Sequence, residues 1–145
     1  QTMTAKGTYW SIDQGATRYM CPEEGGGLTT VEADTQLEIN TAFVARNLFV
    51  MIDGNNTDNA STVKTRIGGV DGNLSISIPA GTTGILEDTT NSDTLALGNL
   101  LNYQVIAGAG AGGDRLDLVI VGFELQQPTG APSGSVVPIF MGMMG

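Results

Sequence analysis

Apolar and polar residues alternate with a period of two along much of this chain, and this pattern constrains its fold more than any other feature. The clearest case is residues 74–78, where Leu74, Ile76 and Ile78 alternate with two serines. Such spacing places the apolar side chains on one face of a strand, whereas an amphipathic helix needs a period of 3.6. About eight such segments, separated by turn residues every ~8 to 15 positions, predict an antiparallel β-sandwich or barrel.

The predicted strands share alternation or dense β-branched and aromatic content. They lie within residues 6–12, 17–21, 28–39, 41–54, 62–69, 71–79, 99–108 and 114–125. In residues 41–54 both parities are apolar, which favours a central strand over the competing helix. Asp71-Gly72 is a hairpin signal, and the glycine–alanine run at residues 107–113 is predicted to be a hairpin tip.

Residues 84–99 combine Glu87, Asp88 and Asp93 with several Thr, Ser and Asn residues. Such oxygen ligands suit Ca²⁺, but the same residue types are typical of exposed turns, and we favour the turn interpretation. We therefore expect Glu87 to Asp93 to cross between two strands, with Leu95 and Leu97 returning to the core. A second acidic loop has the same chemistry and the same favoured interpretation. Its candidate ligands are Asp53, Asn55, Thr57 and Asp58.

Composition excludes several classes of partner. The 145 residues suit one domain, and the net charge is −9 with only six Lys and Arg residues, none clustered. Phosphate backbones and anionic membranes require clustered positive charge, so we expect neither nucleic acid nor membrane as a partner. No apolar run approaches the ~20 residues of a membrane helix, and the first ten residues do not resemble a signal peptide.

Catalytic equipment is sparse. The chain has no histidine and one cysteine, Cys21, which excludes Ser–His–Asp and Cys–His arrangements. Carboxylate pairs for glycoside hydrolysis could be drawn from Glu32, Glu38 and Glu87, but no spacing singles one out. We expect a non-enzymatic protein without a cofactor, a metal site or catalytic residues.

The end of the sequence differs in texture. Residues 128–135 form a linker rich in Pro, Gly and Ser, and an apolar segment follows. We predict an N-terminal arm at residues 1–6, a sandwich at 7–127, and a linker with an apolar C-terminal arm at 128–145. The arm is predicted to contact a second subunit, since soluble chains rarely leave such residues in water. Its contact residues are Val136, Val137, Ile139, Phe140, Met141, Met143 and Met144.

A motif within residues 60–125 resembles small jelly-roll proteins carried on tailed-phage virions. The matching residues are Gly84, Asp88, Thr89, Thr90, Asn91, Asp93, Gly98 and Tyr103. Leu97 stands where the family usually has Ala, and Asn99 where it has Asp. The resemblance implies an eight-stranded jelly roll with extended terminal arms. It also implies a homotrimer that decorates the virion surface and binds a major capsid or other virion protein.

Two other functions remain open at this point. One is a self-assembling subunit of a phage tail, a fibre or an extracellular filament, which would use the same apolar arm. The other is a carbohydrate-binding adhesion module, in which Tyr9 and Trp10 stack on a sugar beside the oxygen-rich loops. A tryptophan in a first strand more often belongs to a core or an interface.

Overall fold

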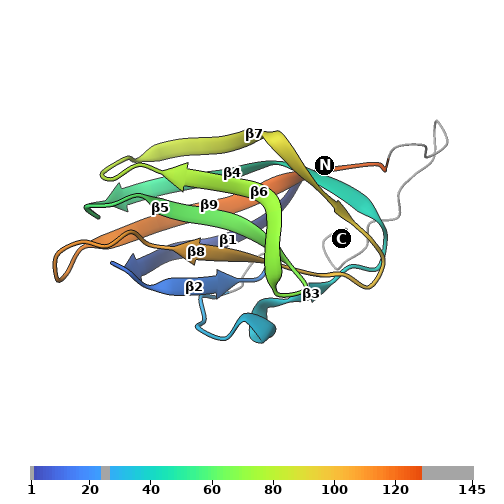
Figure 1. The fold of residues 1–145 in the computed structure, drawn as a ribbon, viewed down its shortest axis with the longest axis horizontal. Helices are drawn as coiled ribbons and strands as arrows, with labels where there is room; N and C mark the ends of the chain where they lie inside the picture. The colour runs from blue at the N-terminus through green and yellow to red at the C-terminus, as the bar shows by residue number, and fades with distance from the viewer. Residues whose placement is uncertain (1, 24–26, 129–145) are drawn as a thin grey trace.

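Two antiparallel sheets pack face to face in the computed structural model, which describes residues 2–23 and 27–128, with the backbone alone at residues 5–9 (Figure 1). The four-stranded sheet has the order β1 (Thr2–Asp13), β9 (Arg115–Gln126), β4 (Phe43–Asn55), β7 (Gly84–Leu95). The five-stranded sheet has the order β2 (Thr17–Met20), β8 (Leu100–Ile106), β5 (Ser61–Ile67), β6 (Val70–Ile78), and the short β3 (Leu37–Glu38) also pairs with β8.

This order is that of a jelly roll. The chain passes from one sheet to the other at every connection except β2–β3 and the β5–β6 hairpin, so that β1, β9, β4 and β7 face β2, β8, β5 and β6. The pattern is a pair of interleaved Greek keys with eight main strands. The predicted all-β, antiparallel, jelly-roll-like sandwich is therefore confirmed. Within the described residues, no helix is long and apolar enough to span a membrane.

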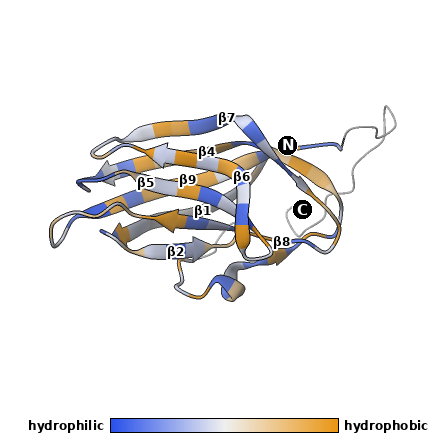
Figure 2. Cartoon of the chain, in the orientation of Figure 1, coloured by the Kyte–Doolittle hydropathy of each residue, from blue (hydrophilic) through white to orange (hydrophobic). Residues whose placement is uncertain are grey.

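The core lies between the inward faces of the two sheets. Leu74, Ile76 and Ile78 are each at most 4% exposed, as the alternation predicts. Phe123 of β9 stacks on Phe43 at a centroid distance of 6.0 Å and meets Tyr103 edge-on at 6.1 Å, which links both sheets. Figure 2 shows the hydrophobic colour recurring along the strands of both sheets.

The predicted strand at residues 41–54 is confirmed as β4, a strand paired on both edges. Ala45 and Leu48 both point into the core, although they are three positions apart and regular alternation would put them on opposite faces. The strand register shifts at Asn47, and because of this shift the side chain of Leu48 points into the core. The outer positions are apolar too, with Phe49 and Met51, and this explains why the sequence showed apolar residues at both parities.

Two local predictions were wrong. Residues 28–39 do not form one strand, because Glu32–Thr35 makes a turn of 3-10 helix, η1, and only Leu37–Glu38 forms a named strand, β3. The Thr35 hydroxyl donates to the Glu32 carbonyl at 2.8 Å and stabilises that turn. The β5–β6 turn lies at Gly68 and Gly69, both with positive φ, and Asp71-Gly72 is inside β6.

The terminal arms have different outcomes. Residues 2–6 belong to β1 and pair with β9 from Thr2↔Glu124 to Lys6↔Ile120, so they extend the sheet instead of forming an arm. Backbone pairing to a neighbouring strand satisfies their N–H and C=O groups, which a free arm would leave to water. The predicted C-terminal arm, residues 136–144, lies outside the described residues.

Candidate functional site

Coincident bulges in β4 and β7 distort the outer face of the four-stranded sheet. Arg46 pairs with Ser92 and Leu48 with Asp88, so β7 has three residues where β4 has only Asn47. Asn47 has a positive φ of 52°, which Asn tolerates better than most residues. Bulges of this kind redirect side chains, and here they turn a run of polar residues outward.

The predicted crossing between Glu87 and Asp93 is part of one continuous strand, β7. Asp88 and Asp93 point inward at either end of the bulge and are 6% and 2% exposed. Leu95 returns to the core as predicted, whereas Leu97 is 71% exposed, which contradicts the prediction for that residue. Leu97 lies in the β7–β8 turn, beyond the last pair of β4 and β7.

Asp88 is held by a dense set of donors. Its carboxylate accepts the backbone N–H groups of Ser75, Thr90 and Asn91 at 3.0 to 3.1 Å, and also the Asn91 side-chain amide. Burial by itself would raise the pKa of Asp88, but these hydrogen bonds lower it from 3.8 to about 2. The carboxylate is therefore a fixed acceptor that organises the bulge, and it is a poor proton carrier near neutral pH.

Asp93 closes the adjacent edge of the sandwich. It accepts the Asn73 N–H at 2.6 Å, the Leu74 N–H at 3.4 Å and the Thr65 hydroxyl at 2.5 Å. These donors belong to the five-stranded sheet, so the side chain joins β7 to β5 and β6. Gly72 permits the close approach, because a Cβ there would lie 2.8 Å from the Asp93 carboxylate.

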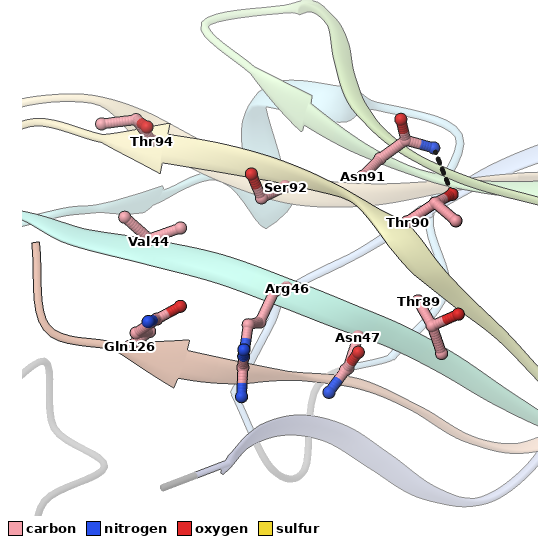
Figure 3. Close-up of a pocket in the computed structure, with 9 residues that line it drawn as sticks. All are labelled: Val44, Arg46, Asn47, Thr89, Thr90, Asn91, Ser92, Thr94 and Gln126. Carbon is pink, nitrogen blue, oxygen red and sulfur yellow. Dashed lines mark hydrogen bonds between the residues drawn. The ribbon is translucent and has the colours of Figure 1, made fainter. Parts of the chain in front are cut away.

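The outward residues of the bulges enclose a polar hollow of about 380 Å³ (Figure 3). Its lining comes from β4, β7 and the end of β9. The lining residues are Val44, Arg46, Asn47, Thr89, Thr90, Asn91, Ser92, Thr94 and Gln126. Arg46 is the one charged residue among these nine, and Glu124 lies beside it, with a shortest N–O distance of 3.9 Å. The Asn47 amide also donates to Glu124.

The chemistry of this lining is that of hydrogen bonding. Four residues contribute hydroxyls and three contribute amides, and each of these groups can both donate and accept. None of the nine residues supplies a carboxylate, a thiol or an imidazole that could accept a proton from a substrate. The hollow is thus suited to recognition of a polar ligand.

An apolar row lies beside the hollow on the same outer face. Met51 of β4 pairs with Ile85 of β7 and with Ile120 of β9, so the three side chains stand next to one another across the sheet. Ile85 is 64% exposed and Met51 39%, while Ile120 is partly buried. Phe49 continues the apolar surface two residues along β4.

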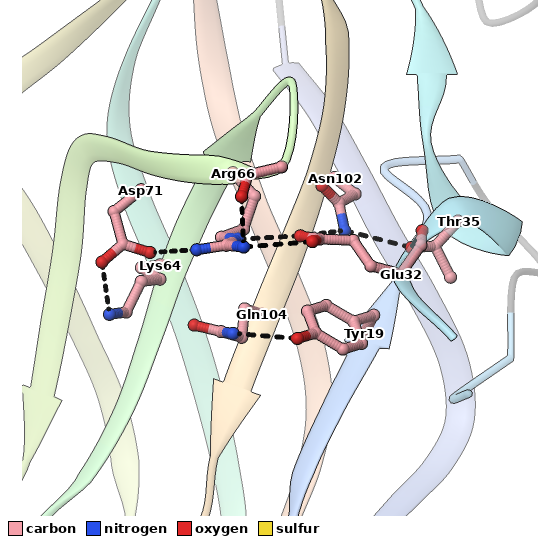
Figure 4. Close-up of polar contacts among 9 residues, drawn as sticks. Tyr19, Glu32, Thr35, Lys64, Arg66, Asp71, Asn102 and Gln104 are labelled. Atoms are coloured by element: carbon pink, nitrogen blue, oxygen red, sulfur yellow. Dashed lines mark hydrogen bonds and ion pairs between the residues drawn. The ribbon is translucent and has the colours of Figure 1, made fainter. Parts of the chain in front are cut away.

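A polar network covers part of the outer face of the five-stranded sheet (Figure 4). Arg66 donates to both oxygens of Glu32, at 2.7 and 3.0 Å, and to Asp71 at 2.6 Å. The hydrogen bonds from Arg66 lower the pKa of Glu32 below its usual value. The Asn102 amide donates to Glu32 and to Thr35, at 3.3 and 3.1 Å. This network fixes η1 to the sheet.

In the candidate calcium loop at residues 53–58, the side chain of Asn55 is engaged in hydrogen bonds within the protein. The Asn55 side-chain oxygen accepts the Thr57 N–H at 3.1 Å and the Thr57 hydroxyl at 2.7 Å, which is an Asx turn. Its amide donates to the Thr82 carbonyl at 3.1 Å. Among the described residues, no group of three or more His, Cys, Asp or Glu side chains is placed to hold a metal ion.

The remaining candidate carboxylates and the thiol are dispersed. Glu32 lies on η1 and is paired with Arg66, whereas Glu38 and Glu87 are exposed on β3 and β7. Cys21 is partly buried, and burial raises the pKa of its thiol, which lowers its reactivity at neutral pH.

The proposed sugar platform at Tyr9 and Trp10 is contradicted for Trp10. This side chain is 5% exposed and belongs to the core, so it offers no stacking surface. The side chain of Tyr9 and the predicted intersubunit residues Val136 to Met144 lie outside the described part of the chain. Sequence reasoning missed the hollow, although the uninterrupted polar run from Thr89 to Ser92 was a signal that this strand could not alternate regularly.

Comparison with known proteins adds little. No protein-family model and no curated protein matches the chain. A solved structure with some similarity is the CBM36-1 domain of a multidomain xylanase from the hindgut metagenome of Trinervitermes trinervoides. It is 14% identical over 86% of this chain and 95% of that chain, with a TM-score of 0.38. The sandwich architecture of this chain rests on its own strand order.

Proposed function

We propose that this chain is a structural, self-associating subunit on the surface of a virus particle, where it acts as a capsid decoration protein. The observation that carries the proposal is the apolar row of Ile85, Met51 and Ile120 on the outer face of the four-stranded sheet. Three adjacent strands each present an apolar side chain outward at the same level. Association would remove that surface from water, at roughly 25 cal/mol per Å² of apolar area.

The C-terminal sequence supports the same role. Seven large apolar residues between Val136 and Met144 follow a Pro/Gly/Ser linker, and a second copy of the chain offers an apolar row to receive such a segment. Interfaces between stable subunits are built by burying this kind of surface. A homo-oligomer, with a trimer favoured by the resemblance, is thus the expected assembly unit.

The resemblance to phage decoration proteins supplies the viral part of the proposal. Asp88 and Asp93, which carry much of the resemblance, are the residues that organise the β7 bulge and close the sandwich edge. These contacts support the view that the motif serves jelly-roll construction, an architecture that occurs in viral capsid proteins and in lectins. Particle binding must be tested separately, since fold alone does not fix function.

Self-association is tested by analytical ultracentrifugation of the full chain over a wide concentration range. We expect an oligomer, and we expect Met51→Thr combined with Ile85→Thr to weaken it by at least about tenfold in Kd. Val70→Thr is the matched control, because Val70 is also 64% exposed but lies on the other sheet. A wild-type chain that stays monomeric at high concentration would overturn the proposal.

The viral role and the arm need their own measurement. Particles purified from the biological source of the sequence are incubated with the full chain, or with a chain lacking residues 135–145, and examined by co-sedimentation and electron microscopy. We expect the full chain to coat the particles and the truncated chain to bind less. Filaments formed by the purified protein alone, without particle binding, would favour the tail, fibre or filament alternative.

A further inference from the structure

We propose that the polar hollow formed by the coincident β4 and β7 bulges is a binding site for a neutral carbohydrate chain. This goes beyond self-association, because the hollow and the apolar row use different side chains of the same sheet face. The volume of about 380 Å³ is within the range of sites for small ligands, roughly 300 to 1,000 Å³. It would accommodate one or two sugar units in a shallow cleft.

The exposed hydroxyls of the lining indicate the class of ligand. Thr89, Ser92 and Thr94 are exposed to solvent and line the hollow, so their hydroxyls can exchange water for a ligand. Sugar hydroxyls donate and accept at closely spaced positions. The threonine and serine hydroxyls of the lining, with amides beside them, can likewise donate hydrogen bonds to a sugar and accept hydrogen bonds from it.

Charge favours a neutral ligand. Arg46 would attract an anion, but Glu124 lies 3.9 Å from its guanidinium and also accepts from the Asn47 amide. The local charge is thereby balanced, and the whole chain carries −9. An acidic sugar or a phosphate group would meet a negative surface at longer range, which disfavours its approach.

The site is organised before any ligand arrives. Asp88 accepts the backbone N–H of Thr90 and of Asn91, at 3.1 Å each, and holds the Asn91 amide at 2.9 Å from beneath the bulge. These bonds fix the curvature that turns Thr89 to Ser92 outward. A ligand therefore does not have to order this segment, and pre-organisation of this kind reduces the entropic cost of binding.

The test is an NMR titration of the isotope-labelled full chain with neutral oligosaccharides of glucose, xylose, mannose and galactose. Inorganic phosphate and an oligouronide serve as anionic probes. We expect shift changes with at least one neutral sugar, confined to residues 44–47, 89–94 and 126, with millimolar or tighter affinity. Shift changes elsewhere, stronger binding of the anions, or no response to any neutral sugar would overturn the proposal.

A variant pair assigns any binding to the hollow. Thr89→Val combined with Thr94→Val removes two lining hydroxyls without changing side-chain shape, and we expect affinity to fall by about tenfold or more. Thr62→Val on the outer face of β5 is the matched control and should bind as the wild type does. Unchanged binding by the double variant would contradict the assignment. Ultracentrifugation of the same samples shows separately whether self-association persists.

Discussion

Asp88 and Asp93 stand five positions apart in β7, and both side chains point into the sandwich although their neighbours point outward. A buried carboxylate is tolerated only when hydrogen bonds replace its water. Asp88 accepts from three backbone N–H groups and Asp93 from two. The residue types that suggested a calcium loop in the sequence therefore act as buried hydrogen-bond acceptors. Each carboxylate accepts hydrogen bonds from neighbouring strands and so connects them.

We predict that Asp88 makes stability depend on pH in the acid range. Its pKa of about 2 in the folded protein lies below 3.8, so ionised Asp88 contributes about 2 kcal/mol that is fully present above pH ~5 and lost as pH falls toward 2. Asp88→Asn should be less stable at pH 7 by a similar amount. Urea unfolding of both proteins from pH 7 to pH 2 measures the difference, which should shrink as the pH falls.

The neighbouring exposed residue provides the control for this prediction. Glu87→Gln on the same strand should change stability by less than about 0.5 kcal/mol, since Glu87 is solvated. A gap between wild type and Asp88→Asn that stays constant across the whole pH range would contradict the role assigned to the ionised carboxylate.

At the scale of elements, strand β6 approaches β7 through Gly72. A Cβ at this position would lie 2.5 Å from the Thr65 hydroxyl oxygen and 2.8 Å from the Asp93 carboxylate. We predict that Gly72→Ala destabilises the protein by about 2 kcal/mol, because the added methyl group forces β6 away from the Asp93 carboxylate to which it is hydrogen-bonded. Thermal or urea unfolding measures this cost. Gly112→Ala, where no atom lies within 4 Å of the new Cβ, should be close to neutral.

The short η1 turn depends on one side-chain network for its position. We predict that Glu32→Gln weakens the pairing with Arg66 and costs about 1 kcal/mol, since both side chains are largely shielded from water. Hydrogen exchange should become faster in residues 27–38 while β4 and β9 keep their protection. Asp34→Asn, at an exposed position on the same turn, is the control. Equal exchange in both variants would show that the ion pair does not hold the turn.

For the molecule as a whole, one aromatic cluster links the two sheets. Phe123 contacts Phe43 in its own sheet and Tyr103 in the other. We predict that Phe123→Ala lowers the free energy of unfolding by about 3 to 5 kcal/mol. We also expect both sheets of the variant to unfold in one transition. Buried Trp10 fluorescence and far-UV circular dichroism should give the same midpoint, because one core serves both sheets. Two separate transitions would contradict a single cooperative unit.

The fold class and most strands could be read from the sequence, because alternation with a period of two reports which face of a strand is buried. Residues 74–78 follow that rule. In the doubly apolar segment 43–52 the pattern predicts a strand, but the buried parity changes at Asn47, from Phe43 and Ala45 to Leu48, Val50 and Ile52. Residues 28–39 also alternate but mostly do not form a strand. A strand needs a neighbour to satisfy its backbone. Within this segment Leu37 and Glu38 pair with β8, whereas Thr29 makes only an isolated bridge to Tyr19 of β2.

The candidate site required the tertiary structure. The sequence shows a polar run from Asp88 to Asp93, but it does not show which of those side chains turn inward. That direction is set by the register of β7 against β4, where three residues of β7 lie opposite one residue of β4. It is also set by hydrogen-bond donors from β5 and β6, which are distant in sequence. By itself the sequence determined an all-β sandwich with sparse catalytic equipment. Strand pairing in the tertiary structure decided which side chains of the acidic motif point inward. Asp88 and Asp93 hold the sheets together inside the sandwich, and the residues between them line the polar hollow outside.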